Sequence, residues 1–265
     1  CYGDTNLVPT PNIDRLANEG VRFTDGYVSA PLCAPARYGV LTGVYQQKFG
    51  VRWNVDATLN LSQYGIVENE EESRIRKPIE IISEPLERVG YNSVMLGKWN
   101  LMGYPNTTFD ESYSVMHFVG DYFKDKNGDY KGVDGVPSEH EKSRALWAAE
   151  DVGGEYLTDR IGRQAAEYID RNNDNPFFMY VAFNAPHTPL HAKTAHKKQV
   201  EHLPTEAQKL YGAMQISMDE NIGKILNSLD KNGLTENTIV AFLSDNGATF
   251  CLLYTSPSPR DYTRS

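Results

Sequence analysis

The sequence has few cysteines and no long hydrophobic run. Its 265 residues include only three cysteines, Cys1, Cys33 and Cys251, too few for the disulfide framework of a small secreted domain. A membrane-spanning helix needs about 20 consecutive apolar residues, and no such run is present, so we expect no membrane span. The first residues show neither a Met nor a signal-peptide pattern, and we expect the sequence to be a fragment cut at both ends.

Positive charge is also scarce. The chain has 26 Lys and Arg against 35 Asp and Glu, a formal net charge of −9 at pH 7. A chain with this balance repels the phosphates of nucleic acids, so we expect no nucleic-acid partner. If it binds an anion, it needs a local cluster of cationic side chains.

The last residues lack the periodicity of the rest. The run CLLYTSPSPRDYTRS, at 251–265, has neither a helical nor a strand period and resembles a translated sequencing adapter. We therefore expect it to be a non-native tail outside the fold.

Residues 1–250 alternate between helical and strand patterns. The spacing predicts helices from Pro11 to Gly20 and at 36–43, 79–89, 156–170 and 214–229, and strands at 21–23, 93–96, 176–183 and 238–245. This alternation predicts an α/β fold with a largely parallel central sheet flanked by helices. We expect the strand at 176–183 to be central and covered on both faces, because it is a continuous apolar run.

Other segments carry less pattern. Residues 103–140 are rich in Gly, Asp, Asn and Tyr and indicate an elaborated loop, and the specificity region is expected within 51–75 and 103–150. His196, Lys197 and Lys198 are expected to form a solvated helix face.

Polar residues follow three of the predicted strands. Lys98 comes after 93–96, His187 after 176–183, and Asp245 with Asn246 ends 238–245. Ligands of such sheets bind at the carboxyl ends of the strands. We therefore expect these side chains to gather around an anionic substrate and a metal ion.

The segment 31–43 carries the most specific motif. Cys33-Ala34-Pro35-Ala36-Arg37, followed by Leu-Thr-Gly at 41–43, resembles the signature of formylglycine-dependent sulfatases, which have an alkaline-phosphatase-like fold. The stretches TPNIDRLANEGVRF, LGKW, YLTD, PFFMYVAFNAPHTPLHA and MDENIGKIL followed by SDNG agree with that family in order. The resemblance covers residues 1–250, which we expect to form a fragment of a sulfatase catalytic domain lacking the first metal-binding strand and the C-terminal part. Because half of the implied carboxylate ligands are missing, we expect this fragment by itself to bind calcium weakly and to be inactive.

The resemblance implies that a maturation enzyme oxidises Cys33 to formylglycine. The hydrated aldehyde offers two hydroxyls on one carbon, one to attack sulfur and another whose deprotonation expels sulfate, whereas a thiolate would have a poor route to turnover. Arg37, one helical turn further on, can orient the hydrate. A helix that starts after Pro35 would direct amide groups at the anion.

Further residues acquire roles from the same resemblance. Asp245, Asn246 and the modified Cys33 are implied ligands of a divalent cation, normally calcium, which suits oxygen ligands. Lys98 and His187 would contact the sulfate, and His187 would protonate the leaving alcohol. Asn100 departs from the family, which usually has His in this position. Asn can donate a hydrogen bond but cannot transfer a proton.

The function implied is hydrolysis of a carbohydrate or aryl sulfate, with a formylglycine-generating maturase as a partner and export to the periplasm, the extracellular space or a lysosome. Two alternatives remain. A phosphonate or phosphate ester hydrolase would use the same nucleophile, because those esters share the tetrahedral geometry of sulfate. The second alternative is a non-catalytic protein that has kept the fold and binds sulfated glycans. Asn100 is the only residue that supports this alternative.

Overall fold

The computed structural model describes residues 7–49, 51, 80–101, 105–117, 120–124, 127–131, 133–134 and 154–247. The expected tail at 251–265 lies outside these ranges. Most of the expected specificity region, including 52–75 and 135–150, also lies outside them. Within the described ranges, no helix is long and apolar enough to cross a lipid bilayer.

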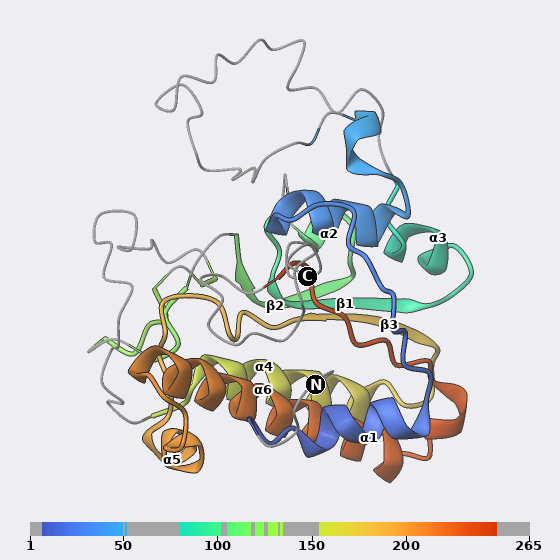
Figure 1. The fold of residues 1–265 in the computed structure, drawn as a ribbon. Coiled ribbons are helices and arrows are strands. Elements are labelled where there is room, and N and C mark those ends of the chain that lie inside the picture. The colour runs from blue at the N-terminus through green and yellow to red at the C-terminus, as the bar shows by residue number, and fades with distance from the viewer. Residues whose placement is uncertain are drawn as a thin grey trace.

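The structure is an α/β fold with a parallel sheet between helices (Figure 1). The helices and strands, in chain order, are α1 (Pro11–Glu19), α2 (Cys33–Thr42), α3 (Ser83–Glu87), β1 (Asn92–Lys98), β2 (Glu111–Met116), α4 (Leu157–Arg171), β3 (Phe177–Ala182), α5 (Thr194–Lys197) and α6 (Glu206–Lys231). Short 3₁₀ turns lie at Gln46–Phe49, Pro105–Thr107, Lys198–Val200 and Thr235–Asn237.

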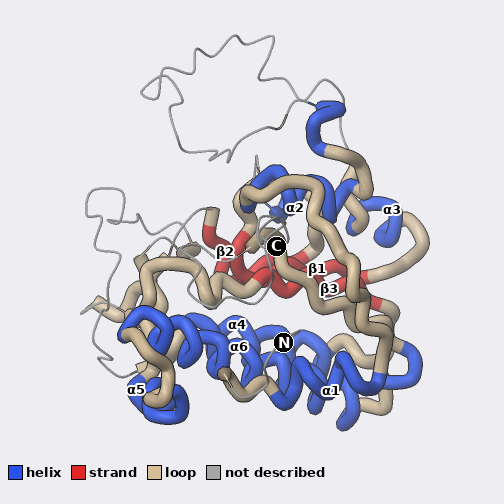
Figure 2. The backbone as a smooth tube through the Cα atoms, in the orientation of Figure 1, coloured by secondary structure: helices blue, strands red, loops and turns tan. Residues whose placement is uncertain are grey.

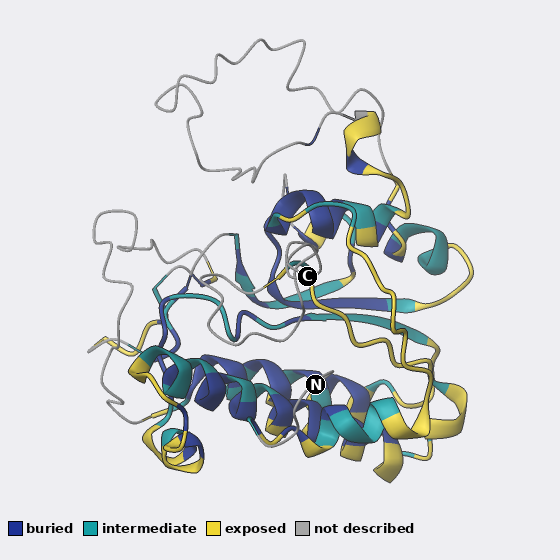
Figure 3. Cartoon of the chain, viewed as in Figure 1, coloured by how far each residue is buried: buried dark blue, intermediate teal, exposed yellow. Residues whose placement is uncertain are grey.

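The strand β1 is the centre of the sheet. The strand order is β2-β1-β3, and β1 pairs in parallel with both neighbours. Successive side chains of a strand point to opposite faces. Accordingly Val94 and Leu96 pack with Ile161 of α4, whereas Met95 packs with Leu41 of α2. The sheet therefore has a core on each face, as the dark blue inner surfaces in Figure 3 show.

Helices form a layer on each side of the sheet (Figure 2). The layer of α1, α4 and α6 covers one face, and α2 with α3 covers the other. The long helix α6 begins with a capping box in which Thr205 and Gln208 exchange hydrogen bonds, which satisfies amides of the first turn. Glycine permits the close approach of α4 to α6, because a Cβ atom at Gly162 would collide with Asn221.

Two predicted strands are absent from the described sheet. Residues 21–23 and 238–245 are not hydrogen-bonded as strands, and Ile239 is 97% exposed. A strand needs a neighbour to complete its backbone hydrogen bonds, and neither segment has one among the described residues. The apolar residues of these segments are therefore not sufficient to form a strand.

Other boundaries differ from the predictions. The helix expected at 36–43 begins earlier, at Cys33, and the helix expected at 79–89 is only Ser83–Glu87. Residues 103–140, expected to be a loop, contain the strand β2, whose ladder to β1 outweighs its irregular composition. The strand at 176–183 is real but lies at one edge of the described sheet.

Candidate active site

The site is built where β1 ends and α2 begins. Cys33 is the first residue of α2 and is buried. Lys98, the last residue of β1, is also buried, and its Nζ donates a hydrogen bond to Cys33 Sγ at 3.3 Å. The thiol and the ammonium group are thus brought together from two elements that are 65 residues apart in the sequence. The Lys98 ammonium group and the amide groups of the first turn of α2 would both attract an anion bound at this position.

The Arg37 side chain is held in place by polar contacts with three residues. It lies one turn after Cys33 in α2, and its Nε and Nη2 contact Asp245 Oδ2 at 2.9 and 2.7 Å. Its Nη1 donates to the Lys98 carbonyl oxygen at 2.8 Å and to the Tyr180 hydroxyl at 3.1 Å. This arrangement joins α2, β1, β3 and the segment that ends at Asp245. The guanidinium group is therefore pre-positioned beside Cys33.

The two cations respond differently to burial. Burial lowers the pKa of Lys98, while the nearby Cys33 opposes that effect. Burial also disfavours the charge of Arg37, but Tyr180, Asp245 and Cys33 together raise its pKa above the usual value. Arg37 is therefore the permanent charge of the site. Lys98 is the cation that an incoming anion would stabilise.

His187 reaches the same region from the turn after β3. Burial, with the positive charge of Lys98 as the next cause, lowers the pKa of His187 to about 4. Its Nδ1 donates a hydrogen bond to the Thr188 carbonyl oxygen at 2.6 Å, which leaves Nε2 as the titrating nitrogen. His187 and Lys98 line a small hollow together with Asn184, Tyr122 and Met116. The histidine is thus neutral at pH 7 in the free protein.

Asn100 is completely buried just after β1. Its backbone has a positive φ of 54°, and neither its Oδ1 nor its Nδ2 forms a hydrogen bond with any residue that the structure describes. An unpaired buried amide costs about 1–3 kcal/mol. The oxygen and nitrogen atoms of the Asn100 amide are therefore available to pair with a ligand bound next to Lys98.

Asp245 and Asn246 supply oxygen atoms of the kind that calcium prefers. Asn246 Nδ2 donates to the Gly247 carbonyl oxygen at 2.9 Å, and Asn246 Oδ1 is buried without a partner among the described residues. Calcium takes about 6–8 oxygen ligands. In the part of the chain that is described, no group of three or more His, Cys, Asp or Glu side chains could hold a metal ion. Asp245 and Asn246 therefore have the donor atoms that calcium takes, but Asp245 Oδ2 is already paired with Arg37 and the described residues do not form a complete calcium site.

The sequence reasoning missed three residues of the site. Tyr180 holds Arg37, the Tyr122 hydroxyl donates to the His187 carbonyl oxygen at 2.9 Å, and Asn184 lines the hollow. Alternation along the strand could have found Tyr180, because Phe178, Tyr180 and Ala182 share the face toward α2. No comparable pattern in the sequence points to Tyr122 or Asn184.

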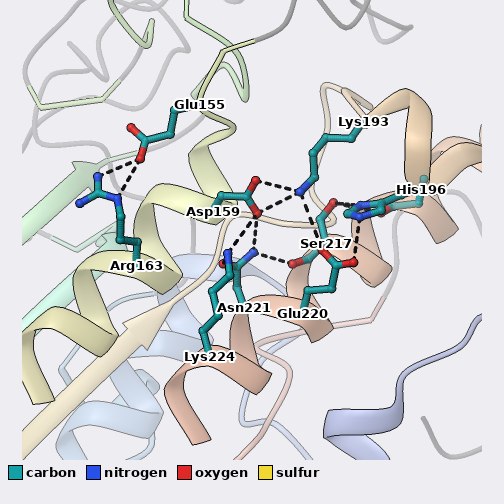
Figure 4. A network of polar contacts seen from close by, with 10 residues as sticks. Glu155, Asp159, Arg163, Lys193, His196, Ser217, Glu220, Asn221 and Lys224 are labelled. Carbon is teal, nitrogen blue, oxygen red and sulfur yellow. Dashed lines mark hydrogen bonds and ion pairs between the residues drawn. The ribbon is translucent and has the colours of Figure 1, made fainter. Parts of the chain in front are cut away.

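A second polar cluster joins α4, α5 and α6 (Figure 4). His196 contacts Ser217 Oγ at 2.6 Å through Nδ1 and Glu220 at 3.0 Å through Nε2. His196 is therefore buried rather than on a solvated face. The order Ser–His–Glu resembles that of a catalytic triad, but Ser217 is fully buried and its hydroxyl also donates to the Ala213 carbonyl oxygen at 3.3 Å. No substrate can reach it, so this cluster holds helices together.

Sequence comparison places the chain among hydrolases of one family. The Sulfatase family model matches residues 1–262. The chain is 31% identical over 255 residues to the uncharacterized sulfatase YdeN of Escherichia coli (strain K12), covering 90% of this chain and 43% of that protein. It is 29% identical to mouse N-acetylgalactosamine-6-sulfatase, covering 90% of this chain and 46% of that protein. The chain spans less than half the length of these two relatives.

Solved structures agree with the fold. The crystal structure of Ps i-CgsB superposes with a TM-score of 0.68 and 28% identity, covering 87% of this chain and 51% of that one. The phosphonate monoester hydrolase of Agrobacterium radiobacter superposes with a TM-score of 0.54 and 18% identity, covering 87% of this chain and 56% of that one. The second likeness shows the fold alone.

Proposed function

This chain belongs to the sulfatase family, and on that premise we propose that the full-length protein hydrolyses sulfate esters of carbohydrates or phenols at Cys33. The observation that carries the proposal is the convergence of Cys33, Lys98 and Arg37. Lys98 touches the sulfur atom, and Arg37 lies one helical turn away, held by Asp245 and the Lys98 backbone. A sulfate group carries negative charge on its oxygens, and two buried cations beside one nucleophile are suited to bind it.

The nucleophile is proposed to be a modified Cys33. A maturase, using an external oxidant, would convert the Cys33 thiol to the formylglycine aldehyde with loss of its sulfur. The hydrated aldehyde would then supply one hydroxyl to attack the sulfur atom of the ester and a second whose deprotonation expels sulfate. A calcium ion held in part by Asp245 and Asn246 would polarise the sulfate and lower the pKa of the attacking hydroxyl. We place this chemistry in the catalytic domain fragment at 1–250 and propose an exported location for the whole protein.

The residues of the chain divide the remaining work. Arg37 orients the attacking oxygen and neutralises charge that builds up beside it, because its own contacts leave it no freedom to turn away. Lys98 binds a sulfate oxygen. The negative charge of that sulfate offsets the effect of Lys98 on His187, so the His187 pKa rises on binding and Nε2 can carry a proton to the leaving alcohol. Asn100 donates a hydrogen bond to the bound ester and cannot transfer a proton.

The test compares two classes of ester on one enzyme. The full-length protein is produced with a formylglycine-generating maturase and assayed with 4-nitrophenyl sulfate, hexose monosulfates and 4-nitrophenyl phenylphosphonate. We expect sulfate esters to have the higher kcat/KM and a Cys33→Ala variant to lose activity toward all of them. Higher activity on the phosphonate would replace the proposal by its phosphoester alternative. Binding of sulfated sugars without any turnover would favour the non-catalytic alternative.

A further inference from the structure

The thiol of Cys33 and the amino group of Lys98 form a buried pair whose reactive atoms are in contact. Cys33 is 9% exposed and Lys98 is 3% exposed. Lys98 Nζ donates a hydrogen bond to Cys33 Sγ at 3.3 Å, so the nitrogen is directed at the sulfur atom. A sulfur and a nitrogen atom held in this way are placed to form a covalent bond once one of them is activated.

The backbone on both sides of this pair is tied together. Cys33 begins α2 and Lys98 ends β1. Arg37 of α2 donates a hydrogen bond to the Lys98 carbonyl oxygen at 2.8 Å, which fixes the end of β1 against the helix that carries Cys33. The lysine side chain is a flexible four-carbon stem. Nζ can therefore close the remaining distance to the sulfur atom while both backbones stay in place.

An oxidant supplies the activation. Hydrogen peroxide oxidises a thiol to a sulfenic acid and is itself reduced to water. A sulfenic acid condenses with a nearby nitrogen atom to a sulfenamide. In that step the lysine ammonium group loses one proton to solvent, and the amine then attacks sulfur. An S–N bond forms, the S–O bond breaks, and the hydroxyl group leaves as water with a second proton from the nitrogen.

The burial of the pair favours this product over a disulfide with another molecule. Peroxide is close to water in size, and Cys33 keeps a small exposed surface. A thiol of glutathione or of another protein is much larger, whereas Lys98 Nζ is already beside the sulfur atom. Lys98 is thus in the position that a resolving cysteine has in many redox sensors.

We propose that Cys33, in molecules where it has not been converted to formylglycine, forms a reversible sulfenamide cross-link with Lys98 on oxidation by peroxide. The bond joins two residues that are 65 positions apart in the sequence and ties α2 to β1. It occupies both the sulfur atom and the amine, so the cross-linked form has lost one of the two cations of the site. The inference goes beyond the proposed function and does not depend on hydrolysis of any ester.

The test uses the whole chain, produced without a maturase so that Cys33 remains a thiol. The substitutions Cys1→Ser and Cys251→Ser remove the other two cysteines, and with them any internal disulfide. The folded protein is treated with hydrogen peroxide, the excess peroxide is destroyed, and the remaining free thiols are alkylated.

Digestion with trypsin and mass spectrometry then identify the product. Because trypsin does not cleave after a modified lysine, we expect the peptide 23–37 to be joined to the peptide 89–124. The mass of the joined peptides should be lower than the sum of the two free peptides by the mass of two hydrogen atoms. Dithiothreitol should separate them. The melting temperature should rise by several degrees on oxidation and return on reduction, because the cross-link constrains the unfolded chain.

The matched control is Lys98→Arg, which keeps the positive charge and removes the amine. We expect no joined peptides from this variant, and its oxidised Cys33 should be recovered as a dimedone adduct of the sulfenic acid or as sulfinic acid. The protein that retains Lys98 decides the question even if this variant does not fold. Cys33 recovered there only as thiol, dimedone adduct or sulfinic acid, or joined to a different lysine, would overturn the inference. Absence of ester hydrolysis by the matured protein would count against the proposed function alone.

Discussion

At the scale of single residues, the site depends on how Arg37 is held. Its side chain has polar contacts with Asp245, the Lys98 carbonyl and Tyr180, which come from three different parts of the chain. The motif around Cys33 identified Arg37 from sequence, because residue types and spacing were sufficient. The contact with Tyr180 could not be read in the same way, since it depends on how β3 is placed against α2.

The Tyr180 hydroxyl should affect catalysis without affecting the fold. Tyr180→Phe removes the group that accepts a hydrogen bond from Arg37 at 3.1 Å. We expect kcat/KM for a sulfate ester to fall about 10- to 150-fold, because losing one hydrogen bond to a charged group costs about 1.5–3 kcal/mol.

The matched control is Tyr130→Phe. It removes a hydroxyl that donates to the Glu155 carbonyl oxygen at 2.7 Å, outside the site. This variant should keep its activity. Equal activity of the two variants would show that Tyr180 does not position Arg37.

At the scale of elements, the strong patterns predicted the elements and the weak ones did not. The amphipathic helix at 156–170 is confirmed as α4, and the apolar run at 176–183 as β3. The predicted strand at 238–245 failed because a ladder needs a partner, which apolar character cannot supply. The strand β2 was missed because its pairing with β1, not its composition, defines it.

The attachment of α1 depends on a carboxylate of α6. Asp219 is buried and accepts hydrogen bonds from the backbone amides of Asn12 and Ile13 at the start of α1. Asp219→Asn removes the charge and one acceptor at this helix N-terminus, so we expect the free energy of unfolding to fall by about 1–3 kcal/mol. Urea denaturation measures it.

The control for Asp219 lies on the same two helices. Asp230→Asn removes a carboxylate of α6 that pairs with Arg15 of α1 at 2.9 Å, but on the surface. Its effect should be much smaller, because water screens exposed ion pairs. Equal losses for the two variants would mean that Asp219 contributes only an ordinary surface contact.

Gly97 allows β1 and β3 to meet beside the site. Its φ is 92°, and a Cβ atom there would overlap the Ala182 carbonyl oxygen. Gly90 has a φ of 90° and open space around it. We expect Gly90→Ala to cost about 1–2 kcal/mol of unfolding free energy from backbone strain, and Gly97→Ala to cost clearly more. Equal costs would show that the close approach of Ala182 is unimportant.

At the scale of the whole molecule, the chain has a net charge of −9, yet two buried cationic side chains, Lys98 and Arg37, lie together in the site. The sequence predicted that a local cluster of cations would be needed, and the structure supplies it in Lys98 and Arg37 from separate elements. The stability of the fold should depend on pH, because His187 is partly buried in the site and His196 is buried in the cluster that joins α4, α5 and α6. The pKa of His187 is lowered to about 4, and burial also lowers the pKa of His196.

Stability should therefore decline as the solution becomes acidic. In the unfolded chain these histidines take up protons near pH 6.5, whereas folded His187 stays neutral down to about pH 4. The unfolded state thus binds more protons between these values. We expect the unfolding free energy to be highest above pH 6.5 and to fall toward pH 4.

Denaturant unfolding at several pH values measures this decline. A His187→Gln variant should show a shallower decline over the same pH range, because one of the two groups no longer titrates. A flat or rising unfolding free energy toward acid pH would contradict the burial of neutral histidines.

The most direct measurement of the central claim is peptide mass spectrometry of the segment 23–37, after production of the protein with an active formylglycine-generating enzyme. The account predicts a mass loss at Cys33 that corresponds to conversion of the thiol to the aldehyde, together with release of sulfate from an ester. An unmodified thiol at Cys33, with the maturase shown to act on a control substrate, would contradict the account.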